Sequence, residues 1–234
     1  MNVMAMDTSS LTATVAVLND EKLLGEFTIS NKLTHSQTIL PMTEKLLSML
    51  GMSLDEIDVF AVCVGPGSFT GLRIGMATVK TFAQTLNKPI IGISSLDAIA
   101  YNLSYNDDFI ICPIVDSRRN EVYNALYNCG VKILEDRHLH IDDLLVELQG
   151  KKVIFAGDAV MLHRERIETL KESGWRIASN HLLLPSAASA AYCAYKKAIE
   201  GQFDDPYTLN PVYLRKSQAE RELEEKIKHT EEEK

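Results

Sequence analysis

Residues 58–75 read DVFAVCVGPGSFTGLRIG, and this stretch decides the fold. Residues 58–64 form a nearly continuous apolar run, which predicts a strand buried on both faces. Gly65-Pro66-Gly67 ends the run, and residues from Phe69 to Leu86 have the period of a helix. A buried strand, a glycine-rich turn and a helix in this order are typical of α/β proteins, so we expect a sheet covered by helices.

The sequence on either side of this stretch predicts two similar halves. In the first half, strands are expected at residues 3–6, 12–18, 23–29 and 89–93, and helices from residue 36 to a stop at Gly51 and at 95–102. In the second half, strands are expected at residues 109–115, 122–127, 131–134 and 152–156, and helices at 141–148, 164–172 and 187–199.

The repeated order suggests a duplicated α/β lobe. Each half opens with a strand that ends in an aspartate and a hydroxyl, Asp7-Thr8-Ser9-Ser10 in the first and Asp116-Ser117 in the second. A later strand of each half stops at a glycine, Gly65 or Gly157. We therefore expect two lobes around a cleft, each with a mixed sheet flanked by helices, at residues 1–104 and 105–216, followed by a charged tail at 217–234.

Composition excludes several classes of protein. The 234 residues carry 24 Lys plus Arg against 32 Asp plus Glu, a net charge of −8, which argues against a protein that binds nucleic acid on its own. The first residues contain no basic side chain, and no apolar run approaches the ~18–20 residues of a membrane span. Cys63, Cys112, Cys129 and Cys193 are far apart and form no Cys-x-x-Cys pair, so we expect reduced thiols in a cytoplasmic protein without membrane contact.

The two aspartate turns are candidates for a nucleotide site. Two such turns facing across a cleft hold nucleotide phosphates and magnesium in actin-like ATPases, which gives the candidate residues Asp7, Thr8, Ser9 and Asp116. Neither turn contains the glycine that lets backbone N–H groups approach a phosphate closely, so any binding is expected to be weak or vestigial. The alternative is that these side chains only hydrogen-bond the backbone of their own turns.

The glycine-rich segment also has two interpretations. Its N–H groups at a helix start can hold an anion, although no Lys-Ser/Thr follows as in a Walker loop. Ser68 stands one place too early for a Gly-x-Ser-x-Gly elbow, so we do not expect a nucleophile. The small residues Gly71 and Gly75 next to apolar ones indicate a helix face that is either core or interface.

His138 and His140 lack a third ligand nearby, and no metal site is predicted.

Several motifs in order resemble one protein family. They are Asp7-Thr8-Ser9, His35-Ser36-Gln37 with Leu40-Pro41, residues 65–75, Gly92-Ile93-Ser94-Ser95-Leu96, Asp116 to Tyr123, and Pro211-x-Tyr213-Leu214-Arg215. Over residues 3–216 the chain resembles the TsaB (YeaZ) family of the bacterial machinery that makes threonylcarbamoyladenosine next to the tRNA anticodon. The resemblance implies two actin-like/Hsp70-like (ASKHA) lobes and a scaffold or activating subunit without catalysis of its own.

The resemblance also implies partners. TsaB-like proteins pair with the catalytic paralogue TsaD, and TsaE docks on that pair; tRNA is expected only through the complex, and no cofactor is expected. TsaD holds its metal with two histidines in Asn-His-Leu-Glu-Gly-His, and this motif falls on residues 94–99 here. Ser95 and Ile99 replace the histidines, and neither is a suitable ligand for a divalent ion.

Family resemblance places the dimer contact on the first two helices. It implies that Leu40, Leu47, Leu72, Met76 and Val79 are buried across the interface, with a two-fold homodimer when the partner is absent. It predicts that Met76→Asp abolishes the complex but leaves the monomer folded.

A different interpretation remains open, in which the chain is a small actin-fold ATPase or kinase that uses Asp7 and Asp116 with magnesium. For the acidic tail, a solvated helix and a partner-binding arm are both open.

Overall fold

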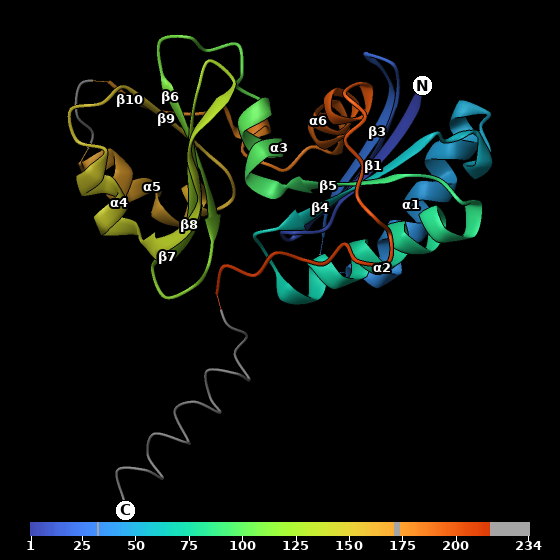
Figure 1. The fold of residues 1–234 in the computed structure, drawn as a ribbon. Coiled ribbons are helices and arrows are strands. Elements are labelled where there is room, and N and C mark those ends of the chain that lie inside the picture. Colours follow the sequence, from blue (N-terminus) through green and yellow to red (C-terminus); the bar gives the residue numbers. More distant parts are fainter. Residues whose placement is uncertain (32, 171–173, 216–234) are drawn as a thin grey trace, which may run out of the picture.

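The computed structural model describes residues 1–31, 33–170 and 174–215 and folds them into two α/β lobes that lie side by side (Figure 1). The sheet of the first lobe contains β1 (Asn2–Asp7), β2 (Thr12–Asn19), β3 (Lys22–Ser30), β4 (Val59–Gly65) and β5 (Ile90–Ser94). Its strand order is β3-β2-β1-β4-β5. The first three strands form an antiparallel meander, whereas β4 runs parallel to both β1 and β5, so the sheet is mixed.

The second sheet repeats this arrangement. It contains β6 (Ile110–Asp116), β7 (Glu121–Asn128), β8 (Val131–His140), β9 (Val153–Ala156) and β10 (Trp175–Ile177) in the order β10-β9-β6-β7-β8. Strands β6, β7 and β8 are antiparallel, and β9 runs parallel to β6 and β10. Taken from β8 to β10, the strand order and directions are the same as those of the first sheet taken from β3 to β5. The expected pair of duplicated lobes with mixed sheets is confirmed.

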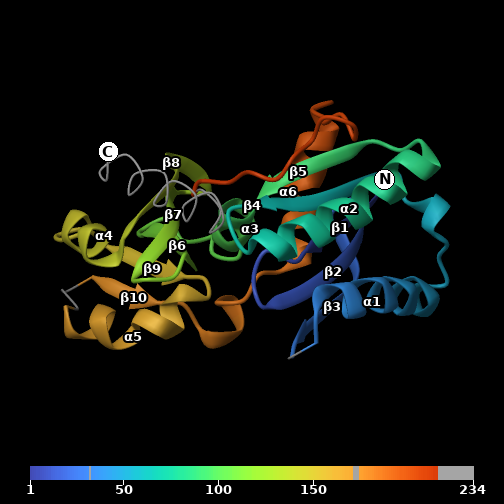
Figure 2. The same cartoon turned by 90° about the horizontal axis from the view of Figure 1, so that it is seen from below.

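Helices cover both faces of the first sheet (Figure 2). The helices α1 (His35–Leu50) and α2 (Phe69–Leu86) lie on one face, and α3 (Ser95–Tyr101) and α6 (Ala187–Ile199) lie on the other. The second lobe carries α4 (Ile141–Glu147) and α5 (Ala159–Thr169), and short 3₁₀ turns occupy Leu54–Glu56 and Asn180–Leu182. The side of α3 that faces away from the first lobe joins the core of the second lobe through Leu96 and Ile99.

The alternation of side chains along β1 explains why both faces need cover. Met4 and Met6 point into the core beneath α1 and α2, whereas Val3 and Ala5 point toward α6. The facing side of α6 consists of alanines, which lets the helix lie close to the sheet. The helix α1 ends at Gly51, whose φ of 64° is in the left-handed region that terminates helices.

Some elements extend beyond the expected bounds. The strand β8 continues through residues 135–140 because its charged side chains find partners: Lys132 pairs with Asp136, and Arg137 pairs with Glu147. The helix α5 begins at Ala159 rather than at residue 164. The three-residue strand β10 is too short to show a period, and the sequence did not predict it.

The domain boundary at residues 104 and 105 stays a prediction. Although α6 follows the second sheet in sequence, it packs against β1, β2, β4 and β5 of the first lobe. The predicted tail at 217–234 and the end of the predicted helix at 171–172 lie outside the described residues. All four cysteines are free thiols. Within the described ranges, no helix is long and apolar enough to cross a membrane.

Candidate functional site

The turn after β1 is filled by its own chain. Asp7 at the end of β1 is fully buried, and its Oδ1 accepts the backbone N–H of Ser9 at 2.7 Å. Burial raises the pKa of Asp7, and the hydrogen bonds with Ser9 partly offset this effect. His35 at the start of α1 donates from Nε2 to the carbonyl of Ser10 at 2.8 Å. The candidate nucleotide residues Asp7, Thr8 and Ser9 are therefore buried. Oδ1 of Asp7 serves the turn itself, whereas its Oδ2 is buried and accepts no hydrogen bond from the described residues.

Three glycines of α2 and the turn before it lie against this buried turn. A Cβ added at Gly67 would meet the carbonyl oxygen of Ser9, one at Gly71 that of Thr8, and one at Gly75 the hydroxyl of Thr8. The spacing of four residues puts Gly71 and Gly75 on one face of α2, and Gly67 lies just before the helix. Thr8 Oγ1 donates to the carbonyl of Gly71 at 2.8 Å, which fastens the turn to α2.

The N-terminus of α2 uses its N–H groups within the chain. The N–H of Ser68 donates to the carbonyl of Ser9 at 2.6 Å, and the Ser68 side chain accepts the N–H of Gly71 at 3.3 Å. These bonds occupy two of the donors that an anion would use at this helix start. The glycine-rich segment thus serves close packing between α2 and the turn after β1.

We expect Gly71→Ala to destabilise the chain by about 3 kcal/mol, because the added methyl group meets backbone that has no room to move. Gly51→Ala is the control: its φ is also strained, at 64°, but nothing lies within 4 Å of the added Cβ, so a cost of only about 1 kcal/mol is expected. Urea unfolding of both variants measures the difference. Equal costs at the two positions would contradict the packing role of Gly71.

The second turn lies at the end of β6 and is more open. Asp116 is half-buried, and its Oδ1 accepts the N–H of Arg118 at 2.8 Å. Arg118, Arg119 and Asn120 all have positive φ angles, of 64°, 56° and 60°. The backbone N–H of Asp116 donates to Oδ1 of Asp158 at 3.0 Å.

Asp158 is the site residue that sequence reasoning missed. It follows Gly157 at the end of β9, and burial, with added repulsion from Asp116 and Asp7, raises its pKa to about 6. The influence of Asp7 on Asp158 means that aspartates of both lobes lie within electrostatic reach of one another. The signal was present in the Gly157-Asp158 pair, which occupies the position in the second half that Gly65-Pro66 occupies in the first.

The raised pKa of Asp158 makes stability depend on pH. Folding favours the protonated carboxyl, so its stabilising effect is present below the usual pKa of 3.8 and is lost as pH rises through about 6. We expect Asp158→Asn, which keeps the acceptor for Asp116, to be about 2 kcal/mol more stable than the unaltered chain at pH 8 and to lose this advantage near pH 4. Urea unfolding of both proteins at the two pH values tests this. An advantage that does not change with pH would contradict the assignment.

A C-terminal strap, residues 204–215, ties the lobes together. It starts at the edge of the first sheet, where Asp204 Oδ2 accepts the N–H of Gly92 at 2.7 Å, and runs along α2 (Figures 1 and 2). The ring of Tyr213 stacks on Phe69 with centroids 4.0 Å apart. Arg215 donates to the carbonyl of Ser117 and pairs with Glu121 at 3.1 Å. The Pro211–Arg215 motif therefore connects α2 with the turn of the second lobe.

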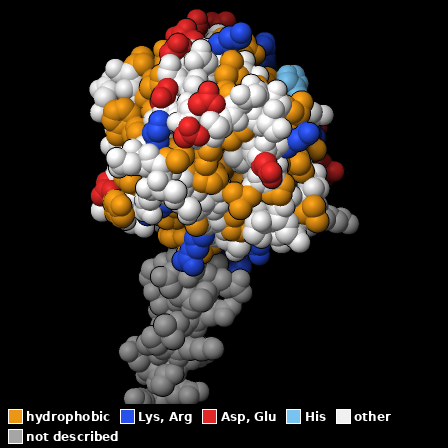
Figure 3. Space-filling view, turned by 90° about the vertical axis from the view of Figure 1, so that its right-hand side faces the viewer, with side chains coloured by type: hydrophobic (Ala, Val, Ile, Leu, Met, Phe, Trp, Pro, Cys, Tyr) orange, Lys and Arg blue, Asp and Glu red, His pale blue; other side chains and the backbone are white. Residues whose placement is uncertain are grey.

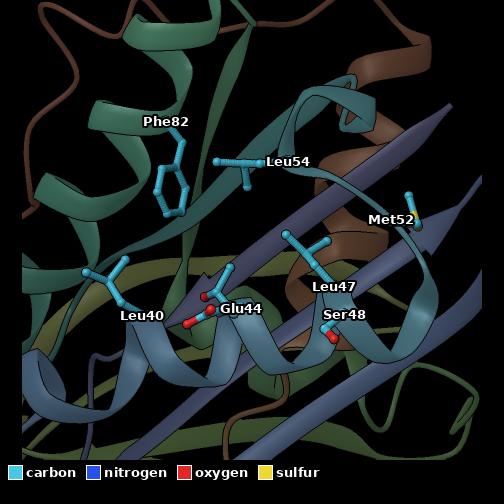
Figure 4. A pocket seen from close by; sticks show the side chains of 8 residues that line it. Leu40, Glu44, Leu47, Ser48, Met52, Leu54 and Phe82 are labelled. Atoms are coloured by element: carbon cyan, nitrogen blue, oxygen red, sulfur yellow. The ribbon is translucent and has the colours of Figure 1, made fainter.

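An apolar groove of about 490 Å³ opens between α1 and α2 (Figure 4). Its hydrophobic lining comes from α1, α2 and the segment after α1: Leu40, Leu47, Met52, Leu54 and Phe82. Glu44 and Ser48 are its polar neighbours on α1. Figure 3 views this end of the molecule and shows hydrophobic side chains exposed among polar and acidic ones.

The residues expected at an interface divide into two groups. Leu40 is 50% exposed and Leu47 lines the groove. Leu72, Met76 and Val79 are 1%, 5% and 0% exposed, since the chain's own core covers them. A surface on this face would thus be made by the groove residues, of which Met52, Leu54 and Phe82 escaped sequence reasoning. Because Met76 belongs to the core, Met76→Asp is expected to disturb folding and cannot report on an interface.

Metal ligands are not grouped in the described ranges. No set of three or more His, Cys, Asp or Glu side chains there is placed to hold a metal ion. Ser95 and Ile99 are both fully buried in α3. His138 lies on β8 beside Ser117, with Nε2 and Oγ 2.8 Å apart, and near Glu121.

Comparisons with known proteins agree on one family. The family model described as "TsaD: tRNA N6-adenosine threonylcarbamoyltransferase" matches residues 22–221. The tRNA threonylcarbamoyladenosine biosynthesis protein TsaB of Bacillus subtilis is 33% identical over 94% of this chain and 96% of its own length. The structure of YeaZ from Pseudomonas aeruginosa covers 91% of this chain and 99% of its own with a TM-score of 0.76 at 26% identity.

A more distant structure shows the same fold. The activator of 2-hydroxyisocaproyl-CoA dehydratase from Clostridium difficile, solved with bound ADPNP, has a TM-score of 0.56 at 12% identity and covers 91% of this chain and all of its own. At that identity the likeness concerns the fold alone, the two-lobed actin-like architecture. Taken with the match to TsaB over nearly the full length, the duplicated lobes and the motifs from Asp7 to Arg215 lead to one conclusion: this chain belongs to the TsaB (YeaZ) family.

Proposed function

We propose that this chain is the non-catalytic subunit that acts with TsaD and TsaE in transferring a threonylcarbamoyl group to the adenosine next to the anticodon of tRNAs. Its relatives are named as proteins of tRNA threonylcarbamoyladenosine biosynthesis, which supports the pathway. The observation that carries the role of an assembly subunit is the apolar groove between α1 and α2.

The groove fits a folded protein partner. Its lining is mainly hydrophobic, Leu40 stands half exposed at its edge, and Glu44 and Ser48 give it a polar rim. An exposed apolar surface with a polar rim is typical of protein–protein interfaces. The partner we assign to it is TsaD.

The partner's fold favours this assignment. The TsaD family model matches residues 22–221 here, a range that contains both α1 and α2. A subunit with the same fold presents an equivalent pair of helices, so the two can meet about a pseudo-two-fold axis. Without TsaD, two copies of this chain would pair through the same face as a homodimer.

The buried first turn supports a role without chemistry. Asp7 is inaccessible beneath the turn that α2 covers, and Ser95 and Ile99 are core residues of α3. The net charge of −8 is consistent with tRNA contact made through the complex. The alternative, an ATPase or kinase using Asp7 and Asp116, has less support, since Asp7 is fully buried and the N–H groups of Ser9, Ser68 and Gly71 are already used within the chain.

We expect Leu40→Asp to weaken binding to TsaD at least about tenfold, because it puts a charge into an apolar contact, while the chain stays folded because Leu40 is half exposed. Leu162→Asp on α5, an equally large change at a leucine that is 66% exposed, is the control and should bind normally. Isothermal titration with purified TsaD measures the affinities. Modification of tRNA reconstituted with TsaD and TsaE should fall with Leu40→Asp and stay normal with Leu162→Asp.

Two results would count against the proposal. Normal binding of Leu40→Asp to TsaD would show that the groove is not the contact. Full tRNA modification by TsaD and TsaE in the absence of this chain would show that the subunit is not required.

A further inference from the structure

A second cavity, of about 300 Å³, lies between the lobes and shares no lining residue with the groove between α1 and α2. Its walls come from α3 and α6, which cover the first sheet, and from β6, β7 and β8 of the second. Neither aspartate turn contributes a side chain to it. The volume is at the small end of the roughly 300–1,000 Å³ typical of ligand sites, and so suits a single small molecule.

One end of the cavity is negatively charged. Oδ1 of Asp97 accepts the hydroxyl of Tyr127 at 2.6 Å and lies 2.8 Å from Nζ of Lys132. The same ammonium pairs with Asp136 at 2.7 Å, and Asp136 in turn accepts the hydroxyl of Ser94 at 2.6 Å. Asp97 and Asp136 share the one ammonium of Lys132, so these three groups together carry one negative charge, although of the two carboxylates only Asp97 lines the cavity. The hydrogen bonds hold Asp97 in place before any ligand arrives, which lowers the entropy cost of binding.

The other end is positively charged. Nζ of Lys196 on α6 lies 5.0 Å from the centroid of the Tyr101 ring, and within the described ranges Lys196 has no carboxylate in ion-pair contact. Tyr101 is itself held by Tyr192, whose ring stacks on it with centroids 5.8 Å apart. Asp97 and Tyr101 are one turn apart on α3, about 6 Å along the helix axis. Asp97 and Lys196 line the same cavity of about 300 Å³, so a small molecule with two opposite charges close together can contact both.

The lining between the charged ends is apolar and unreactive. Ala100, Ile111 and the ring of Tyr127 supply hydrophobic surface. Cys193 also lines the cavity, but burial raises the pKa of its thiol to about 12. The protonated thiol is a poor nucleophile at neutral pH, so the cavity is suited to binding and not to covalent chemistry.

We propose that this cavity binds a small zwitterion of the α-amino acid class, with its ammonium group on Asp97, its carboxylate on Lys196 and an apolar side chain against Ala100 and Ile111. A simple carboxylate would leave Asp97 without the matching charge, and a simple amine would face Lys196. Both charges are therefore needed for tight binding. The inference does not depend on the proposed function, because it concerns the chain alone.

A series of three related compounds tests the charge requirement on the full chain. L-Leucine carries both charges, 4-methylpentanoate lacks the ammonium group, and 3-methylbutylamine lacks the carboxylate. Isothermal titration is expected to show that leucine binds at least about tenfold more tightly than either analogue, the effect of one charge-assisted hydrogen bond. Equal affinities for all three, or no binding of leucine, would overturn the proposal.

Two variants locate the binding. Asp97→Asn keeps an acceptor for Tyr127, and Lys196→Met keeps the alkyl chain over Tyr101, so both should fold normally. Each is expected to weaken leucine binding about tenfold. The amine should lose no affinity with Lys196→Met, and 4-methylpentanoate should lose none with Asp97→Asn, because each variant removes a charge of the same sign as the analogue. Lys151→Met, at an exposed lysine outside the cavity, is the control. Leucine binding that both cavity variants leave unchanged would place the ligand elsewhere and refute the site.

Discussion

The close contact between α2 and the turn after β1 is the constraint on which the rest of the first lobe depends. Only glycines at positions 67, 71 and 75 let the helix lie directly on the backbone of Thr8 and Ser9. That contact buries Asp7, uses the N–H groups at the start of α2 and sets the position of α2 relative to α1. The groove between the two helices is a consequence. The same packing therefore buries the first aspartate turn and leaves an apolar groove between the two helices.

In the second lobe, too, the surroundings of the charged side chains depend on which elements pack against them. At the turn after β6, Asp158 at the start of α5 accepts the N–H of Asp116, and Asp116 itself stays half-buried, whereas burial raises the pKa of Asp158. Farther along, Lys132 neutralises only one of two adjacent carboxylates, and Lys196 stands apart on α6. The two lobes have one topology, yet the side chains at equivalent places meet different neighbours. Their chemistry has diverged accordingly.

Most of the fold follows from sequence periodicity, and the limits of prediction have physical causes. The helix at residues 69–86 and the strand before it were predicted because apolar spacing and glycine punctuation agree there. The extension of β8 was missed because charged residues occupy a strand when partners from other elements neutralise them. Burial of Leu72, Met76 and Val79 within the chain could not be separated from burial in an interface, because spacing does not say what lies opposite a helix face. Asp158 depends on contact between distant segments, which a linear pattern does not contain.

The strap has a mechanical consequence. The chain passes from the first lobe to the second after α3, returns before α6, and crosses once more where Tyr213 rests on Phe69 and Arg215 grips the turn at Ser117. A hinge motion that opens the two lobes would have to break the contacts of Tyr213 with Phe69 and of Arg215 with Ser117. The strap therefore adds contacts to both lobes that oppose a change in the angle between them.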